Sequence, residues 1–115
     1  MQKELTYEVG VKLIDRILPE SGRVRKVWEL LNSDVETQAY LKMANVFAVQ
    51  RLRYNDHGPV HSRIVAGSAL AVFKILTEKG FKPSVVVDGV GDMEDAMVVT
   101  LMGAYLHDIG NSVHR

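Results

Sequence analysis

The feature that most constrains this 115-residue sequence is the stretch from Ala96 to Gly110, which is apolar along most of its length and ends in an adjacent His107 and Asp108. Only Thr100 interrupts the apolar run before His107, so the stretch predicts a helix that is buried nearly all round. Aspartate is almost never fully buried without a partner, which predicts a cationic group at this end of the helix. A divalent metal fits, because a helix C-terminus carries partial negative charge and the two side chains offer nitrogen and oxygen ligands. We expect Gly110 to take the left-handed conformation that ends a helix.

The overall composition narrows the class of protein. Lys and Arg together equal Asp and Glu at 14 each, so no net field favours DNA or an anionic membrane as a partner. The chain has no Cys, which excludes disulfides and thiolate metal sites and is compatible with a cytoplasmic protein. No apolar run is expected to span a membrane, and the first residues show no signal peptide.

Hydrophobic periodicity predicts an all-α fold, a bundle of about five helices. The expected helices cover about 6–18, 23–31, 33–53 and 59–79, followed by the central helix, which begins after Asp92. A β-branched run at 85–87 is too short to support a sheet. Trp28 lies on an apolar stripe and is expected in the core, with a ligand-stacking role as the alternative.

Several helix ends carry recognisable signals. Ser33 and Glu36 form a predicted capping box, and Asp92 is predicted to cap the central helix with Asp95. Pro59 occupies a first helical position. In the helix at 6–18 the expected inward residues are Val9, Leu13 and Ile17. In the helix at 33–53 they are Val35, Ala39, Met43, Val46, Phe47 and Gln50. In the helix at 59–79 they are Val60, Ile64, Val65, Ala69, Val72, Phe73 and Leu76.

His61 is the strongest candidate for a further ligand, because it lies one turn before Val65 and is expected to point inward with it. A lone histidine on an apolar face is usually a hydrogen-bonded core residue. Two buried imidazoles and a buried carboxylate have few other ways to be satisfied, so His61, His107 and Asp108 together predict a metal site. Imidazole and carboxylate ligands suit Mn, Fe, Ni, Zn or Mg.

The segments His57–Val65 and Ala104–Gly110 resemble the two metal-ligand motifs of the HD-domain superfamily of metal-dependent phosphohydrolases. Together with the helix between them they cover about half of the chain. The resemblance implies an HD-domain-like helical bundle in which His61, His107 and Asp108 bind a divalent metal. It also implies hydrolysis of a phosphomonoester or phosphodiester, such as a nucleotide, by a metal-bound hydroxide.

Further residues receive roles from the same hypothesis. Asp108 would also orient the attacking water, while His57 and Arg51 would take up charge on the phosphoryl oxygens. His114 would bind the substrate phosphate or a second metal, and Asn111 stands where many members carry a substrate-binding Lys. The alternatives are a loop residue for His57, a cation suited to a helix C-terminus for Arg51 and a solvated terminal residue for His114.

The sequence departs from the family in lacking its closing ligand, an Asp on a later helix, since no Asp follows Asp108. We therefore interpret residues 1–115 as one partial HD domain, with N-terminal helices in 1–32, a metal-site core in 33–115 and the C-terminal part missing. Asp88 or a partner chain are alternative sources of the ligand. The alternative function is a catalytically incomplete module that binds metal or nucleotide in a regulatory or oligomerisation role, for example as a homodimer.

Overall fold

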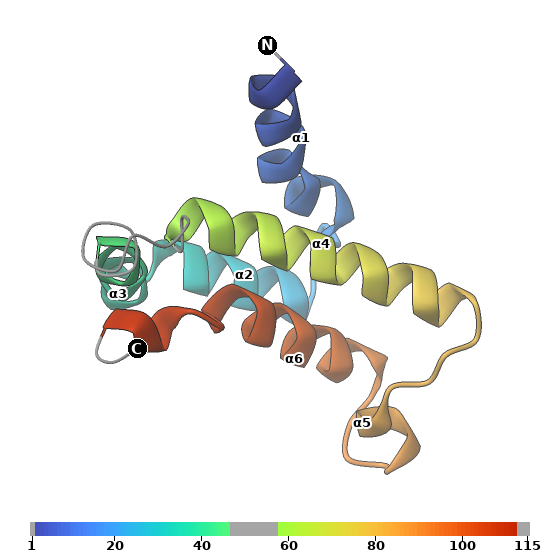
Figure 1. Cartoon of the computed structure of the whole chain (residues 1–115). Helices are drawn as coiled ribbons and strands as arrows, with labels where there is room; N and C mark the ends of the chain where they lie inside the picture. Colours follow the sequence, from blue (N-terminus) through green and yellow to red (C-terminus); the bar gives the residue numbers. More distant parts are fainter. Residues whose placement is uncertain (1, 47–57, 113–115) are drawn as a thin grey trace.

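The computed structural model describes residues 2–46 and 58–112, and all regular secondary structure in these ranges is helical. The α-helices are α1 (Gln2–Ile17), α2 (Arg23–Ser33), α3 (Val35–Asn45), α4 (Pro59–Glu78), α5 (Ser84–Val87) and α6 (Met93–Leu106), and a short 3₁₀ helix, η2 (Ile109–Ser112), follows (Figure 1). Five of the α-helices are long and α5 is a single turn. The predicted all-α bundle is confirmed.

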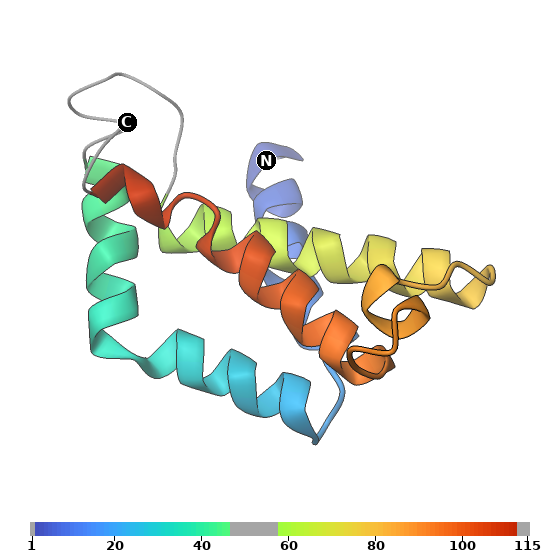
Figure 2. The ribbon, with the colours of Figure 1, turned by 90° about the horizontal axis from the view of Figure 1, so that it is seen from below.

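Helix α4 lies at the centre of the arrangement. It packs against α1 on one side and against α6 on the other, and α6 also packs against α2. The chain runs in opposite directions along α4 and α6, so the start of α4 lies near the end of α6 (Figures 1 and 2). Helix α3 crosses this end of the bundle and contacts η2. The beginning of α4 and the end of α6 are therefore brought together beside α3.

The core lies where α1, α2, α4 and α6 meet, and α3 adds Leu41 to it. Its buried side chains are Ile14, Leu18, Val24, Trp28, Leu31, Leu41, Ala66, Leu70, Leu101 and Tyr105. The Trp28 ring meets the Tyr105 ring edge-on, with centroids 5.3 Å apart and an interplanar angle of 83°. Trp28 is thus a core residue, as expected.

Small residues let α4 approach α1 closely. A Cβ atom on Gly67 would lie 3.0 Å from the backbone nitrogen of Ile14, so any larger residue would push the two helices apart. Arg63 fastens the same contact, because its Nε donates to the Val11 carbonyl at 2.9 Å and its Nη2 pairs with Asp15 at 3.0 Å. The position of α4 relative to α1 is fixed by both steric fit and charge.

The N-terminal end of α6 is held by a polar cluster. Asp92 caps the helix by accepting from the Asp95 amide, which confirms the predicted cap, and the Asp95 carboxylate accepts from the Asp92 amide in return, which makes a capping box. The Arg23 guanidinium reaches from α2 to Asp92, Glu94 and Asp95 at 2.8, 3.3 and 2.8 Å. The pKa of Asp92 lies below its ordinary value, first because the Asp95 amide donates to its carboxylate and second because Arg23 does. The pKa of Glu94 is lowered mainly because the Arg23 amide donates to it. These bonds tie α2 to α6.

The predicted start and inner face of α3 were wrong. The N-cap is Asp34, whose carboxylate accepts from the Thr37 amide, whereas Ser33 ends α2 and its hydroxyl donates to the Glu29 carbonyl. The buried residues are Leu41 and Ala44. The expected inner positions Val35, Ala39, Met43 and Val46 are exposed, and residues 47–53 of the predicted helix lie outside the described ranges.

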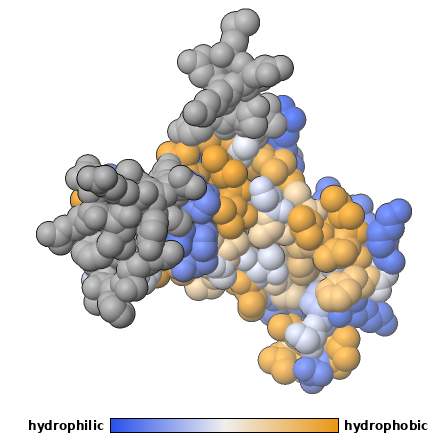
Figure 3. Space-filling model, viewed as in Figure 1, coloured by the Kyte–Doolittle hydropathy of each residue, from blue (hydrophilic) through white to orange (hydrophobic). Residues whose placement is uncertain are grey.

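Three further expectations about packing were wrong. Helix α6 buries Ala96, Leu101 and Tyr105, but it exposes Val99 and Met102, so it is not buried all round. On α4 the buried residues are Ser62, Ala66, Gly67 and Leu70, and the expected core residues Val72 and Leu76 are exposed. On α1 the fully buried residue is Ile14 rather than the expected Leu13 or Ile17, which are half-buried; the Val9 side chain is not described. Figure 3 shows hydrophobic residues, in orange, on the part of the surface in this view that is not grey.

The glycines that end helices gave mixed results. Gly80 follows α4 with a φ of 99°, which is the left-handed stop that the sequence predicts. Gly110 lies inside η2 and is not among the described glycines with positive φ, so its expected left-handed conformation was wrong. The chain leaves α6 through a tighter 3₁₀ turn instead.

By length and composition alone, α4 is the one described helix that could cross a membrane, contrary to the expectation that no such run exists. In the structure it packs between α1 and α6 and carries Arg63, which is paired with Asp15.

Candidate metal centre

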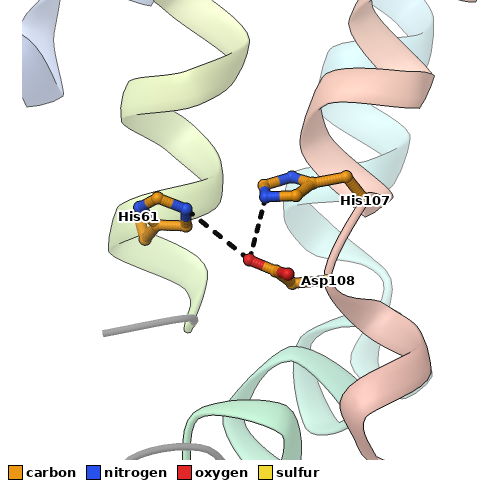
Figure 4. Close-up of side chains that lie close together, drawn as sticks. All are labelled: His61, His107 and Asp108. Carbon is orange, nitrogen blue, oxygen red and sulfur yellow. Dashed lines mark ion pairs between the residues drawn. The ribbon is translucent and has the colours of Figure 1, made fainter. Parts of the chain in front are cut away.

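Three potential metal ligands meet where α4 begins and α6 ends. His61 is the third residue of α4, while His107 and Asp108 follow directly on α6 (Figure 4). Their ligand atoms all lie within 4.8 Å of one another. The structure therefore brings together the three residues that the sequence predicts as ligands.

The Asp108 carboxylate lies between the two imidazoles. Its Oδ2 is 2.8 Å from His107 Nε2 and 3.6 Å from His61 Nε2, as the dashed lines in Figure 4 show. The Asp108 side chain is only 10% exposed, whereas His61 and His107 are 33% and 38% exposed. Asp108 is therefore buried, but the expectation of two buried imidazoles was wrong, because both histidine side chains are partly exposed.

The other ring nitrogen of His107 determines what its Nε2 presents to Asp108. Nδ1 lies 2.7 Å from the Ala104 carbonyl, which can only accept, so Nδ1 carries the hydrogen and donates it. In a neutral imidazole Nε2 is then an acceptor, and it faces the carboxylate oxygen of Asp108 at 2.8 Å. Two acceptors at this distance require a cation between them, either a proton on Nε2 or a metal ion.

The two distances from Asp108 to the histidines are close to the spacing of ligand atoms around a metal ion. Two ligand atoms each about 2.1 Å from a tetrahedral metal are about 3.4 Å apart. The contacts of 2.8 and 3.6 Å from Asp108 to the two histidines lie on either side of that value. The bond from His107 to the Ala104 carbonyl is also the kind that orients metal-binding histidines. Imidazole, imidazole and carboxylate form a donor set that fits a divalent metal.

Helix α3 helps to position these ligands. Gly58 is the buried N-cap residue of α4, and a Cβ on it would lie 2.8 Å from Cβ of Asn45, the last residue of α3. A larger residue at 58 would displace the helix start that carries His61. On the other side, η2 packs against α3 directly after Asp108. Pro59 marks the start of this helix in the sequence, but the approach of Asn45 to Gly58 depends on the tertiary fold.

The structure excludes one candidate ligand and leaves others outside the described residues. Asp88 follows α5, at the opposite end of α6 from His107 (Figure 1), and it does not belong to the described metal-binding group, so its role as a substitute ligand was wrong. Arg51, His57 and His114 lie outside the described residues. Asn111 falls in η2, where only its backbone is described.

The chain is similar to a longer archaeal protein. An uncharacterised protein of Methanocaldococcus jannaschii is 51% identical to it over 94 residues. The match covers 82% of this chain but only 36% of that protein, so the chain spans about a third of the length of this curated relative. No protein-family description and no solved structure matches the chain.

Proposed function

We propose that this protein is a metal-dependent phosphohydrolase whose metal is held by His61, His107 and Asp108. The proposal is supported above all by the grouping of three potential ligand atoms from His61, His107 and Asp108 within 4.8 Å of one another. The resemblance of both ligand segments to HD-domain motifs connects this donor set with phosphate ester hydrolysis.

The residues of this chain have separable tasks in such a site. Ala104 fixes the hydrogen of His107 on Nδ1 and thereby keeps Nε2 available as a ligand. Asp108 contributes the negative charge, and its burial keeps competing water away from the carboxylate. A divalent ion, when bound, would supply Lewis acidity and lower the pKa of a coordinated water.

A three-residue donor set leaves further coordination positions for the substrate or for other protein groups. The part of the archaeal relative beyond the match is long enough to provide such groups, since 64% of that protein is unmatched. We expect Arg51, His57, Asn111 and His114 to contact the phosphate. The substrate is a small phosphorylated molecule, with nucleotides as the first class to test, and the expected location is the cytoplasm.

The test combines metal content with turnover. The purified protein is analysed for bound metal, reloaded with Mn, Ni or Zn, and assayed with p-nitrophenyl phosphate, bis-p-nitrophenyl phosphate and a nucleotide panel. The His107→Ala variant should lose both metal and hydrolysis, while Asp92→Asn, at the far end of α6, should retain both. The archaeal relative is assayed in parallel, because it contains the longer polypeptide.

The outcomes separate the two functional hypotheses. Metal lost in His107→Ala, together with hydrolysis by either protein, supports the phosphohydrolase. Metal binding without turnover in either protein leaves the alternative, a module that binds metal or nucleotide without catalysis. Equal metal content in His107→Ala and the parent chain contradicts the proposed site.

A further inference from the structure

Ser62, the residue after the candidate ligand His61, has a hydroxyl group that the fold buries without a protein partner. Ser62 is 0% exposed. In the described part of the chain, its Oγ is the one buried side-chain polar atom that makes no hydrogen bond to the protein. A buried hydroxyl without a partner costs free energy, and alanine would avoid that cost and favour the helix. A serine at this position therefore indicates that its hydroxyl binds something in the folded protein.

Two other hydroxyls on the described helices are satisfied within their own helix. Ser33 Oγ and Thr100 Oγ1 each donate to the carbonyl four residues earlier, at 2.7 and 2.9 Å. This is the usual bond of serine and threonine inside a helix. The equivalent acceptor for Ser62 is the Gly58 carbonyl, which accepts the Ser62 amide at 3.0 Å but not its hydroxyl. The Ser62 hydroxyl is thus directed away from its own helix backbone.

The buried sides of α4 and α6 both lead to the metal-ligand end. On α4, fully buried residues recur every four positions at Leu70, Ala66 and Ser62. On α6, the buried side runs through Leu101, Tyr105 and, three residues later, Asp108. The apolar members of both lines belong to one core cluster, and the two helices run in opposite directions (Figures 1 and 2). Ser62 and Asp108 therefore end the two lines at the same end of the core.

Ser62 and Asp108 also have complementary hydrogen-bonding groups. Among the residues whose side chains the structure describes, they are the two buried polar or charged ones. A hydroxyl can donate a hydrogen, whereas an ionised carboxylate only accepts. No direct bond joins them, since Ser62 Oγ has no partner within hydrogen-bond distance. One water molecule that accepts from the hydroxyl and donates to the carboxylate would satisfy both groups, which is the usual role of internal water.

We propose that Ser62 is a positioning residue for Asp108, acting through one internal water molecule that its hydroxyl and the carboxylate share. The link holds the Asp108 carboxylate where its Oδ2 faces His61 and His107. Groups that orient a ligand from behind in this way tune metal affinity. The inference rests on the proposed function where it concerns metal affinity, but its effect on stability is measured without metal.

The stability of the metal-free chain provides the first test. With a chelator present, Ser62→Ala should lower the melting temperature by at least about 4 °C, because it removes a bond that supports a buried charge. The control Ser68→Ala, at an exposed position on the same helix, should leave the melting temperature unchanged or raise it. A hydroxyl without a ligand predicts the opposite sign at Ser62, and a hydroxyl bonded to Gly58 predicts no decrease.

A double substitution identifies the acceptor. In an Asp108→Ala background, Ser62→Ala should lower the melting temperature by less than about 1 °C, because the carboxylate end of the link is already gone. In a Tyr105→Phe background, which removes a different buried hydroxyl, the full decrease caused by Ser62→Ala should persist. This pair of backgrounds separates a link to Asp108 from a general effect on the core.

Metal binding tests the positioning role. Ser62→Ala should weaken binding of Mn, Ni or Zn by about 10-fold to 100-fold. It should also change the visible absorption spectrum of the Co²⁺-loaded chain, which reports ligand geometry. Ser62→Thr keeps the hydroxyl and should bind metal within about threefold of the parent affinity, even where its extra methyl group lowers the melting temperature. A merely structural role would lower stability without moving affinity or spectrum.

Three results would overturn the inference. They are an unchanged or raised melting temperature in metal-free Ser62→Ala, a decrease that persists in the Asp108→Ala background, and parent-like affinity and Co²⁺ spectrum in Ser62→Ala. Should Asp108→Ala not melt cooperatively, the first and third results decide. A parent chain without metal, or with as much as His107→Ala, would contradict the proposed function instead. The two stability results would still show whether Ser62 is linked to Asp108.

Discussion

The two ends of α6 both gather ionisable side chains from distant parts of the chain, yet their chemistry differs. At the N-terminal end, Arg23 of α2 meets Asp92, Glu94 and Asp95. At the C-terminal end, His61 of α4 meets His107 and Asp108. Arg23 lies 69 to 72 positions from its three partners, and His61 lies 46 and 47 positions from His107 and Asp108.

At the N-terminal end, the hydrogen bonds and ion pairs of Arg23, Asp92, Glu94 and Asp95 each join a donor to an acceptor. The two capping carboxylates accept from each other's amides, Arg23 donates to all three acids, and the side chains are between 37 and 63% exposed. Carboxylates also suit the positive end of the helix dipole. Ordinary helix-terminus physics accounts for this cluster without any ligand.

At the C-terminal end the contact between His107 and Asp108 needs either a proton on His107 Nε2 or a metal ion between the two side chains. The neutral form of His107 presents an acceptor to the acceptor Asp108, and the carboxylate is largely buried. A cluster of ionisable side chains is therefore not in itself a binding site. A mismatch between hydrogen-bond roles at a buried carboxylate is the more specific indication.

The largest predicted effect contrasts the two ends directly. Asp108→Asn should weaken binding of Mn, Ni or Zn by at least about 100-fold, because it removes the anionic ligand of the group. Asp92→Asn is the matched control, an Asp-to-Asn change on the same helix, and should alter affinity less than about twofold. Competition against a fluorescent chelator measures the metal affinity of both variants. Equal losses of affinity would mean that Asp108 is not a ligand that distinguishes the two ends of α6.

Metal-linked stability gives the next effect. At a free metal concentration of 100 times the dissociation constant, binding should raise the free energy of unfolding by about 2.7 kcal/mol. The rise should vanish in His107→Ala and persist in Arg23→Gln. Thermal unfolding with and without a chelator measures it. A rise of equal size in His107→Ala would assign the stabilising metal to another place on the chain.

Tyr105 tests how far the metal site extends, because its buried hydroxyl lies two residues before His107 and we expect it to have only a structural role. Its hydroxyl accepts from Gln38 Nε2 at 2.8 Å, which also donates to the Leu31 carbonyl at 2.8 Å. Tyr105→Phe should lower the free energy of unfolding by about 1 kcal/mol through loss of this bond. Metal affinity should change less than about twofold. A larger change in affinity would extend the site to Tyr105.

Much of this fold is predictable from local sequence signals. The bounds of α2 and α4, the capping box of Asp92 and Asp95, and the stop at Gly80 all follow from side chains that act within a few residues. The group of His61, His107 and Asp108 was predicted because two ligand-rich segments flank apolar helices. Family resemblance supplied their proposed roles.

Packing between distant segments could not be predicted in the same way. In α3 the apolar residues occupy more than one side, so periodicity did not distinguish buried Leu41 from exposed Met43. In α6 the composition indicated burial all round, although Val99 and Met102 are exposed. The contacts of Arg23 span about 70 residues and leave no local trace. The tautomer of His107 likewise depends on three-dimensional geometry.

The smallest predicted effect concerns acid and the N-terminal end of α6. Because folding lowers the pKa of Asp92 and Glu94, these groups stabilise the fold above their ordinary pKa values, and the contribution is lost as the pH falls through their folded values. With a chelator present, the melting temperature should stay level to about pH 5 and decline below about pH 4. Arg23→Gln should melt at most about 5 °C lower at pH 7, since the cluster is exposed, and should decline less steeply in acid. The two curves should therefore converge near pH 3. Parallel curves down to that pH would mean that Arg23 does not stabilise these carboxylates. The ion pairs of Arg23 would then not account for the cluster at the N-terminal end of α6.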